Sequence, residues 1–159
     1  MDITVFRIDD RLIHGQIITA WIAYADAKEI IVADDKAAQD EFQQSLLKMA
    51  TPNHMKLHIF NVADAIEFLK TDTSSEKALM LVREPKAAYE LIEAGIEMGS
   101  INIGNMNMKK GKKKVLGNMW VFPEDVDYLR KISEKGTKLE VRAVPNDKSQ
   151  DAIDLLKKF

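Results

Sequence analysis

The chain has 159 residues, of which 46% are apolar and 30% are charged, the proportions of an ordinary soluble globular protein. This length predicts a single domain, residues 1–159, with one sizeable core. The net charge of −2 gives no overall attraction to nucleic acid or anionic lipid, and the absence of cysteine excludes disulfides and Cys-based zinc sites.

The sequence contains neither a secretion signal nor a membrane span. Its first residues lack the basic segment followed by an apolar run that marks a signal peptide. No stretch of about 18 apolar residues is present, as a transmembrane helix would require. We therefore expect a soluble cytoplasmic protein.

The first predicted unit is a strand, a polar turn and a helix. Residues 3–6 are apolar and β-branched or aromatic, residues 7–16 read RIDDRLIHGQ, and residues 16–24 have apolar side chains at helical spacing. Trp21, within this helix, is expected in the core or an interface. Ligands bind at the carboxyl ends of strands in open α/β sheets, so the turn is the first candidate site.

The residue types in this turn suit a phosphoryl group. His14 is a candidate nucleophile, and Arg11 offers a guanidinium fork for phosphate oxygens. Gly15 allows close backbone approach, and the helix N-terminus that begins with Gly15 and Gln16 favours an anion. Asp10 is predicted to support the loop or Arg11. The alternative is a half-buried histidine that closes a turn, with Arg11 and Asp10 as a local ion pair.

The remaining chain alternates between short apolar runs and segments with helical spacing. Strands are predicted at residues 29–33, 55–60, 78–82, 100–103 and 139–144, with one or two more in 115–122. Helices are predicted at residues 37–50, 62–69 and 87–94, from Pro123 to Gly136, and after a Ser149 cap. This order predicts an α/β fold: an open, doubly wound, mostly parallel sheet with helices on both faces.

Several polar residues lie outside the first turn. Asp34 and Asp35 follow a buried strand and are expected to cap the next helix, although they could also border the site. His54 and His58 are interpreted as ordinary loop and strand residues, because no third ligand has metal-like spacing. The basic run 109–114 is typical of a solvated loop.

The segment RIDDRLIHGQI resembles the active-site loop of the IIB components of the mannose/fructose/sorbose family of the bacterial phosphoenolpyruvate-dependent sugar phosphotransferase system. Residues 31–35, 45–52 and 101–106 resemble the family's second strand, the end of its second helix and a later strand-loop. Asn105 differs from the second glycine expected in many members. The resemblance covers essentially the whole chain. It implies seven strands with one antiparallel strand, expected from residues 115–122.

The resemblance also implies a phosphoryl relay. A phosphohistidine on a IIA partner would donate to Nδ1 of His14, which would pass the group to a sugar imported by a membrane IIC/IID complex. The chain would associate peripherally with that complex, without a metal or organic cofactor, and a homodimer is left open. We expect Arg11 and the helix dipole to lower the pKa of His14 and keep it neutral. Lys109, Lys110 and Lys112, with Arg7 and Arg11, are expected to steer the partner.

Other functions fit parts of the same pattern. One is a flavodoxin-like module that binds a phosphate ester, and another is a phospho-regulated signalling module with Asp34 or Asp35 as acceptor. A third is a structural adaptor, for which the charged turn is incidental. Phosphohistidine is labile in acid, whereas an acyl phosphate is labile in base. The stability of the label therefore distinguishes phosphorylation of His14 from phosphorylation of Asp34 or Asp35. The sequence does not name the sugar.

Overall fold

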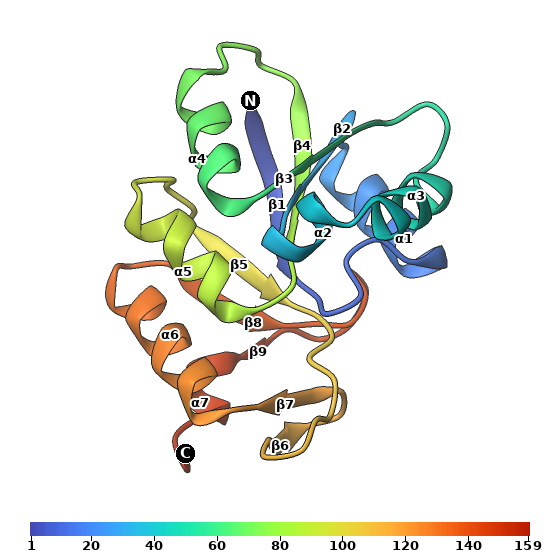
Figure 1. Ribbon diagram of the computed structural model, residues 1–159. Coiled ribbons are helices and arrows are strands. Elements are labelled where there is room, and N and C mark those ends of the chain that lie inside the picture. Colours follow the sequence, from blue (N-terminus) through green and yellow to red (C-terminus); the bar gives the residue numbers. More distant parts are fainter.

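A computed structural model describes residues 1–15 and 18–159, and the side chains of residues 16–17 lie outside this description. In the described chain, a seven-stranded sheet has the order β3-β2-β4-β1-β5-β8-β9 (Figure 1). Its strands are β1 (Asp2–Ile8), β2 (Glu29–Ala33), β3 (Lys56–Phe60), β4 (Lys77–Val82), β5 (Ser100–Ile103), β8 (Lys138–Val141) and β9 (Gln150–Asp151). All neighbours are parallel except β8 and β9. The predicted α/β fold is therefore confirmed.

Helices cover both faces of this sheet. They are α1 (Gly15–Ala25), α2 (Asp35–Gln39), α3 (Glu41–Ala50), α4 (Val62–Thr71), α5 (Pro85–Glu93), α6 (Pro123–Glu134) and α7 (Ala152–Leu155). Side chains of α1, α2 and α3 pack in one core, and those of α4 to α7 pack in the other. The strands between these layers are apolar on both sides, as a buried parallel sheet requires.

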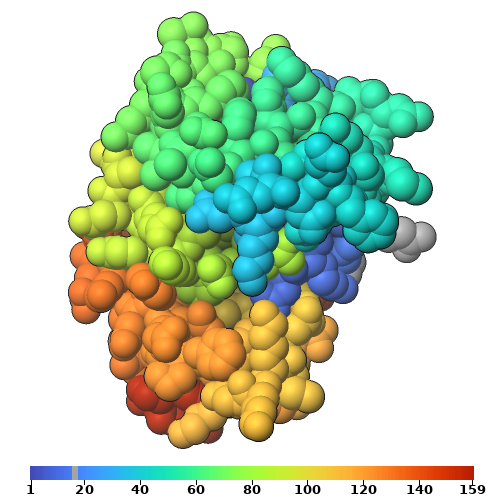
Figure 2. Space-filling model, viewed as in Figure 1, coloured from blue at the N-terminus to red at the C-terminus, as the bar shows by residue number. Residues whose placement is uncertain are grey.

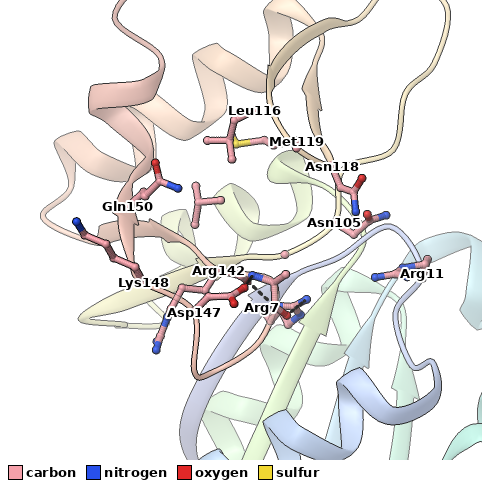
Figure 3. A pocket seen from close by; sticks show the side chains of 14 residues that line it. Arg7, Arg11, Asn105, Leu116, Asn118, Met119, Arg142, Asp147, Lys148 and Gln150 are labelled. Atoms are coloured by element: carbon pink, nitrogen blue, oxygen red, sulfur yellow. Dashed lines mark hydrogen bonds between the residues drawn. The ribbon is translucent and has the colours of Figure 1, made fainter.

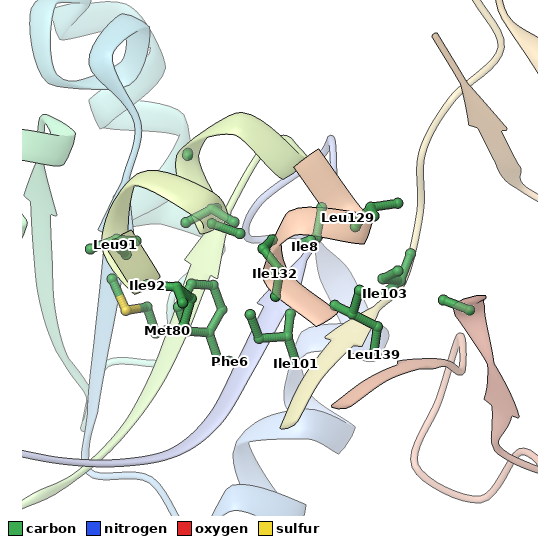
Figure 4. Close-up of a cluster of buried hydrophobic side chains, with 14 of the residues drawn as sticks. Phe6, Ile8, Met80, Leu91, Ile92, Ile101, Ile103, Leu129, Ile132 and Leu139 are labelled. Carbon is green, nitrogen blue, oxygen red and sulfur yellow. The ribbon is translucent and has the colours of Figure 1, made fainter. Parts of the chain in front are cut away.

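Strand β1 illustrates why the two cores form. Val5 points into the core beneath α1, whereas Phe6 and Ile8 point into the opposite one, which Figure 4 shows beside α5 and α6. Trp21 of α1 is fully buried, as predicted. The apolar stripe of α6, which includes Leu129 and Ile132, closes the second core. Both layers therefore hold the carboxyl end of β1 rigidly from either side.

The expected source of the antiparallel strand was wrong. Residues 115–122 contribute a separate hairpin, β6 (Lys113–Leu116) and β7 (Met119–Val121), and the antiparallel strand of the main sheet is β9. Gly117, at φ +46°, provides the turn between the hairpin strands. The backbone of Met106 bonds to Asn118 and Trp120 of the hairpin, which places β7 beside the loop after β5.

Two helix boundaries also differ from prediction. The expected helix 37–50 is divided at Asp40, which has extended backbone angles and accepts hydrogen bonds from the first turn of α3. The last helix is capped by Asp151, which accepts from the backbone N–H of Asp154. Ser149 instead donates to Glu140 at 2.6 Å. In both places an aspartate carboxylate accepts from the first turn of the helix that follows, and so sets where that helix begins.

Candidate functional site

The turn between β1 and α1 is fixed by the ends of neighbouring strands. The N–H of Asp9 donates to the carbonyl of Val82 in β4, and the N–H of Asp10 donates to the carbonyl of Asn105 after β5. Leu12 is fully buried with φ +56°, a strained left-handed conformation for leucine. Burial of its side chain therefore holds the turn in a conformation that short-range preferences disfavour.

Beneath this turn, Arg7 and Asp9 form a buried ion pair. Arg7 is 1% exposed, and its Nη2 lies 3.0 Å from Oδ2 of Asp9. The same guanidinium donates to the side chain of Asn102 and to the carbonyls of Arg142 and Ala143. Because it is buried in this network, Arg7 is not a surface cation, and its expected part in steering a partner was wrong.

His14 lies above the buried carboxylate. Its Nε2 is 3.9 Å from Oδ2 of Asp9, is buried, and has no hydrogen-bond partner among the described residues. Its Nδ1 is 3.3 Å from the carbonyl oxygen of Leu12. Burial lowers the pKa of His14, and the charges of Arg11 and Arg7 lower it further, against opposing effects from Asp9 and Leu12. The expected direction is confirmed, with burial as its largest cause, and the neutral imidazole is favoured.

Arg11 lies at the surface of the same network. Its side chain is 39% exposed, and its Nε is 3.5 Å from Oδ1 of Asp9, which also accepts from the Arg11 backbone N–H at 2.9 Å. The alternative interpretation paired Arg11 with Asp10, whereas the carboxylate that faces Arg11 is that of Asp9. A contact of 3.5 Å is long for a hydrogen bond, so the guanidinium keeps donors for another anion.

Asp10 supports the site from a different side. Its carboxylate accepts from the backbone N–H of Asn107, and its carbonyl accepts from Arg83 at 2.9 Å. Asp10 therefore links the first turn to the loop after β5 and to Arg83. Gly15 has φ +46°, with open space where a Cβ would stand. The predicted Gln16 contact lies outside the described side chains.

Asp34 and Asp35 serve the fold. Asp34 caps α2 by accepting from the N–H of Ala37 at 3.0 Å, and it pairs with Arg83 at 3.2 Å. Asp35 accepts from the N–H of Val62 at 2.9 Å. The capping interpretation is therefore confirmed for Asp34, whereas Asp35 accepts from the start of α4 rather than capping α2. His58 pairs with Glu29 at 2.8 Å, and His54 is an exposed loop residue.

The lysine run borders the first turn. In Figure 2 the amber surface of residues 105–115 lies beside the blue surface of the turn, consistent with the Asn107–Asp10 hydrogen bond. Lys109 and Lys110 are exposed, whereas Lys112 is half-buried, donates to the carbonyl of Asn107 at 3.1 Å and lies over the Phe122 ring. The first two lysines are therefore more available to a partner than the third.

A pocket of about 490 Å³ opens beside Arg11 (Figure 3). Its walls come from the loop after β5, the hairpin turn and the segment that joins β8 to β9. Sequence reasoning missed this pocket and also missed Asp9. The strand period offered a signal for Asp9, because Arg7 and Asp9 are two residues apart and therefore face the same side.

The family description "PTS system sorbose subfamily IIB component" matches residues 3–159. The fructose-specific EIIB component of Bacillus subtilis is 35% identical over 99% of this chain and 97% of its own length. The mannose-specific EIIAB component of Escherichia coli (strain K12) is 33% identical over all of this chain and 50% of its own length. The crystal structure of the IIBSor domain of the Klebsiella pneumoniae sorbose permease superposes with a TM-score of 0.95 at 32% identity, covering 99% of this chain and 98% of that one.

Proposed function

Because this chain belongs to the sorbose subfamily of PTS IIB components, which are phosphotransferases, we propose that His14 carries the phosphoryl group from a IIA partner to a sugar. The observation that carries this proposal is the placement of an imidazole, its pKa lowered by burial, after the carboxyl end of β1, near a buried carboxylate and a partly exposed guanidinium. The E. coli relative combines A and B in one EIIAB component, which supports a IIA donor.

In the first step, Nδ1 of His14 attacks the phosphorus of a phosphohistidine on the partner. A P–N bond forms on His14 as the partner's P–N bond breaks, and that electron pair returns to the partner's imidazole. Nε2 is buried toward Asp9, and the carboxylate favours the proton on this nitrogen. Nδ1 then keeps the lone pair that the reaction needs, despite its long contact with the Leu12 carbonyl.

The phosphorylated ring brings nearly two negative charges to the turn. Arg11 supplies a bidentate donor for these oxygens, and the N-terminus of α1 at Gly15 and Gln16 supplies backbone N–H groups and a positive dipole end. The first turn of α1 contains no acidic residue that would oppose this charge. Catalysis therefore rests mainly on positioning and on charge stabilisation.

In the second step, a sugar hydroxyl oxygen attacks the phosphorus of phosphorylated His14. A P–O bond forms, the P–N bond breaks with its electron pair returning to Nδ1, and the hydroxyl proton leaves to solvent. The sugar would be presented by a membrane IIC/IID complex, with which the chain associates peripherally from the cytoplasm as one IIB domain. None of the helices in the described chain is long and apolar enough to cross a membrane.

Phosphopeptide mapping tests this proposal. The chain is incubated with phosphoenolpyruvate, the general phosphotransferase enzymes and a IIA partner, and the labelled residue is identified. His14→Ala should abolish acid-labile label, whereas His54→Ala, which removes an exposed loop histidine, should retain it. Label that persists in His14→Ala, or base-labile label on Asp34 or Asp35, would refute the assignment and favour the phospho-regulated alternative.

A further inference from the structure

The pocket beside Arg11 has the size and shape of a small-molecule site. Its volume of about 490 Å³ falls within the range of ligand-binding clefts. Figure 3 shows Arg11 at one end and Lys148 and Gln150 toward the other, with Asn105 and Asn118 beside Arg11. The pocket therefore extends away from the phosphoryl-transfer turn along the hairpin.

The floor of the pocket is formed by two guanidinium groups that are paired with carboxylates. A Cβ built on Gly104 would lie 2.1 Å from Cζ of Arg7, so the glycine allows the guanidinium to lie directly against the pocket wall. Both Arg7 and Arg142 line the pocket, and the Nε of each is buried without a hydrogen-bond partner in the described chain. Arg7 is paired with Asp9, and Arg142 is paired with Glu140 at 2.6 Å. Arg11 and Lys148 are therefore the lining cations that remain available to a ligand, and Asp147 is the carboxylate among the lining residues.

The walls carry uncharged hydrogen-bonding groups next to an apolar surface. The side chains of Asn118 and Gln150 are exposed in the pocket, and Oδ2 of Asp147 already accepts from the backbone N–H groups of residues 143 and 144. Leu116 and Met119 form the apolar side. Amides and a carboxylate against an apolar wall suit a polyhydroxylated ligand, whose hydroxyl groups both donate and accept.

Arg11 connects the pocket to His14 through the carboxylate of Asp9. Arg11 lines the pocket and lies 3.5 Å from Asp9, and the same carboxylate lies 3.9 Å from Nε2 of His14. We propose that this pocket is a product subsite that holds a sugar phosphate, with its phosphate at Arg11 and its hydroxyl groups along Asn118, Asp147 and Gln150. This inference rests on the proposed function of His14 and adds a sugar-binding role to the chain itself.

Binding titrations on the unphosphorylated chain test the subsite. The probes are mannose 6-phosphate, fructose 1-phosphate, mannose and inorganic phosphate, followed by NMR chemical shifts and calorimetry. A sugar phosphate should bind at least about threefold more tightly than inorganic phosphate and mannose, as one additional hydrogen bond would give. Its chemical shifts should change at residues 104–105, 116–119 and 142–150.

Paired asparagine variants separate the pocket from general surface effects. Asn118→Ala should weaken sugar-phosphate binding by about threefold to tenfold and leave inorganic phosphate unchanged. Asn146→Ala is the matched control, because Asn146 is exposed in the same β8–β9 segment but does not line this pocket. Asp147→Asn should also weaken the sugar phosphate if its carboxylate accepts from a hydroxyl group.

The outcomes distinguish this subsite from the proposed function. Equal affinity for both sugar phosphates and for inorganic phosphate would reduce the pocket to an anion site and overturn the inference, as would no binding or equal losses in the two asparagine variants. These titrations require no phosphoryl transfer, so they stand even if phosphopeptide mapping finds an acceptor other than His14. Mapping at His14 with no sugar-phosphate binding would leave the relay and remove only the subsite.

Discussion

Two aspartate–arginine pairs lie at the carboxyl ends of the sheet strands and have different roles. Asp34 and Arg83 follow β2 and β4, and their polar atoms bond to a helix N-terminus, to each other and to the carbonyl of Asp10. Arg7 lies in β1, and Asp9 directly follows this strand. Around this second pair, the buried Nε of Arg7 and the buried Nε2 of His14 have no hydrogen-bond partner in the described chain. Unsatisfied buried groups are costly, and here they gather around the proposed reacting ring.

The difference teaches how to interpret an ion pair at a strand end. The Asp34 pair satisfies nearby backbone groups, so its contribution belongs to stability. The Asp9 pair is more deeply buried, with Arg7 1% exposed against 23% for Arg83, and it also faces a titratable histidine. We therefore expect changes in the Asp34 pair to affect stability alone, and changes in the Asp9 pair to affect both stability and phosphoryl transfer.

The largest expected effect follows from breaking the deeper pair. Arg7→Met leaves the Asp9 carboxylate buried without its cation, which should cost about 3–5 kcal/mol in the free energy of unfolding. Arg83→Met, at a partly exposed site, should cost less, about 1–2 kcal/mol. Urea denaturation of both variants measures the difference. Equal losses would remove the contrast between the two pairs.

Asp9→Asn tests whether the buried carboxylate sets the state of His14. Because Asp9 raises the pKa of His14 against the effects of burial and Arg11, its neutralisation should lower that pKa further. The substitution also removes the carboxylate that favours the proton on Nε2 and leaves the lone pair on Nδ1. Phosphorylation by IIA should therefore slow by about tenfold, which corresponds to ~1.4 kcal/mol in the barrier. Asp34→Asn is the control and should change neither value, while it weakens the cap of α2. NMR titration of the ring and the initial rate of labelling are the measurements.

The pH dependence of stability has a definite sign in this network. The folded-state pKa of His14 lies below its ordinary value of 6.5, so the unfolded chain binds the proton first as the pH falls. The contribution of His14 to stability is therefore complete above about pH 6.5 and is lost as the pH falls through the folded-state pKa. In Asp9→Asn this loss should extend to lower pH. A profile that is identical in both proteins would argue against coupling of Asp9 to His14.

Arg11→Lys should affect transfer more than stability. The substitution keeps the charge but removes the planar fork, so labelling of His14 should slow by about threefold to tenfold. The side chain is 39% exposed, so the free energy of unfolding should change by no more than about 0.5 kcal/mol. Thermal denaturation measures the change in stability, and the kinetics of labelling measure the change in phosphoryl transfer. Unchanged transfer with a large loss of stability would place Arg11 with the structural pair.

The smallest effect is expected from the lysine run. Replacing Lys109, Lys110 and Lys112 by Gln should slow association with IIA by about twofold to threefold at low salt and less at high salt. The control triple variant changes Lys28, Lys56 and Lys138. These lysines lie at the amino ends of their strands, away from the first turn at the carboxyl ends. Equal rates in the wild type and both variants would limit docking to the first turn.

Much of this arrangement could be predicted from the sequence because apolar runs and polar turns are local signals. The buried strand 29–33 and the placement of His14 after β1 required no distant contact. The hairpin was misplaced because two short strands do not specify their neighbour, which proves to be Met106. The Asp9 pairing was missed although Arg7, Arg11 and His14 are all local to it. The directions of these side chains depend on the conformation of the turn, which contacts with distant residues such as Asn102 help to fix.

The attachment of the hairpin has a mechanical consequence. The Met106 backbone bonds to residues 118 and 120, and the adjacent residues 105 and 107 bond to Asp10, four positions before His14. Residues 105–107 thus connect the hairpin to the first turn through a few hydrogen bonds. A partner that displaced the hairpin would act on the turn that holds His14 through these same bonds.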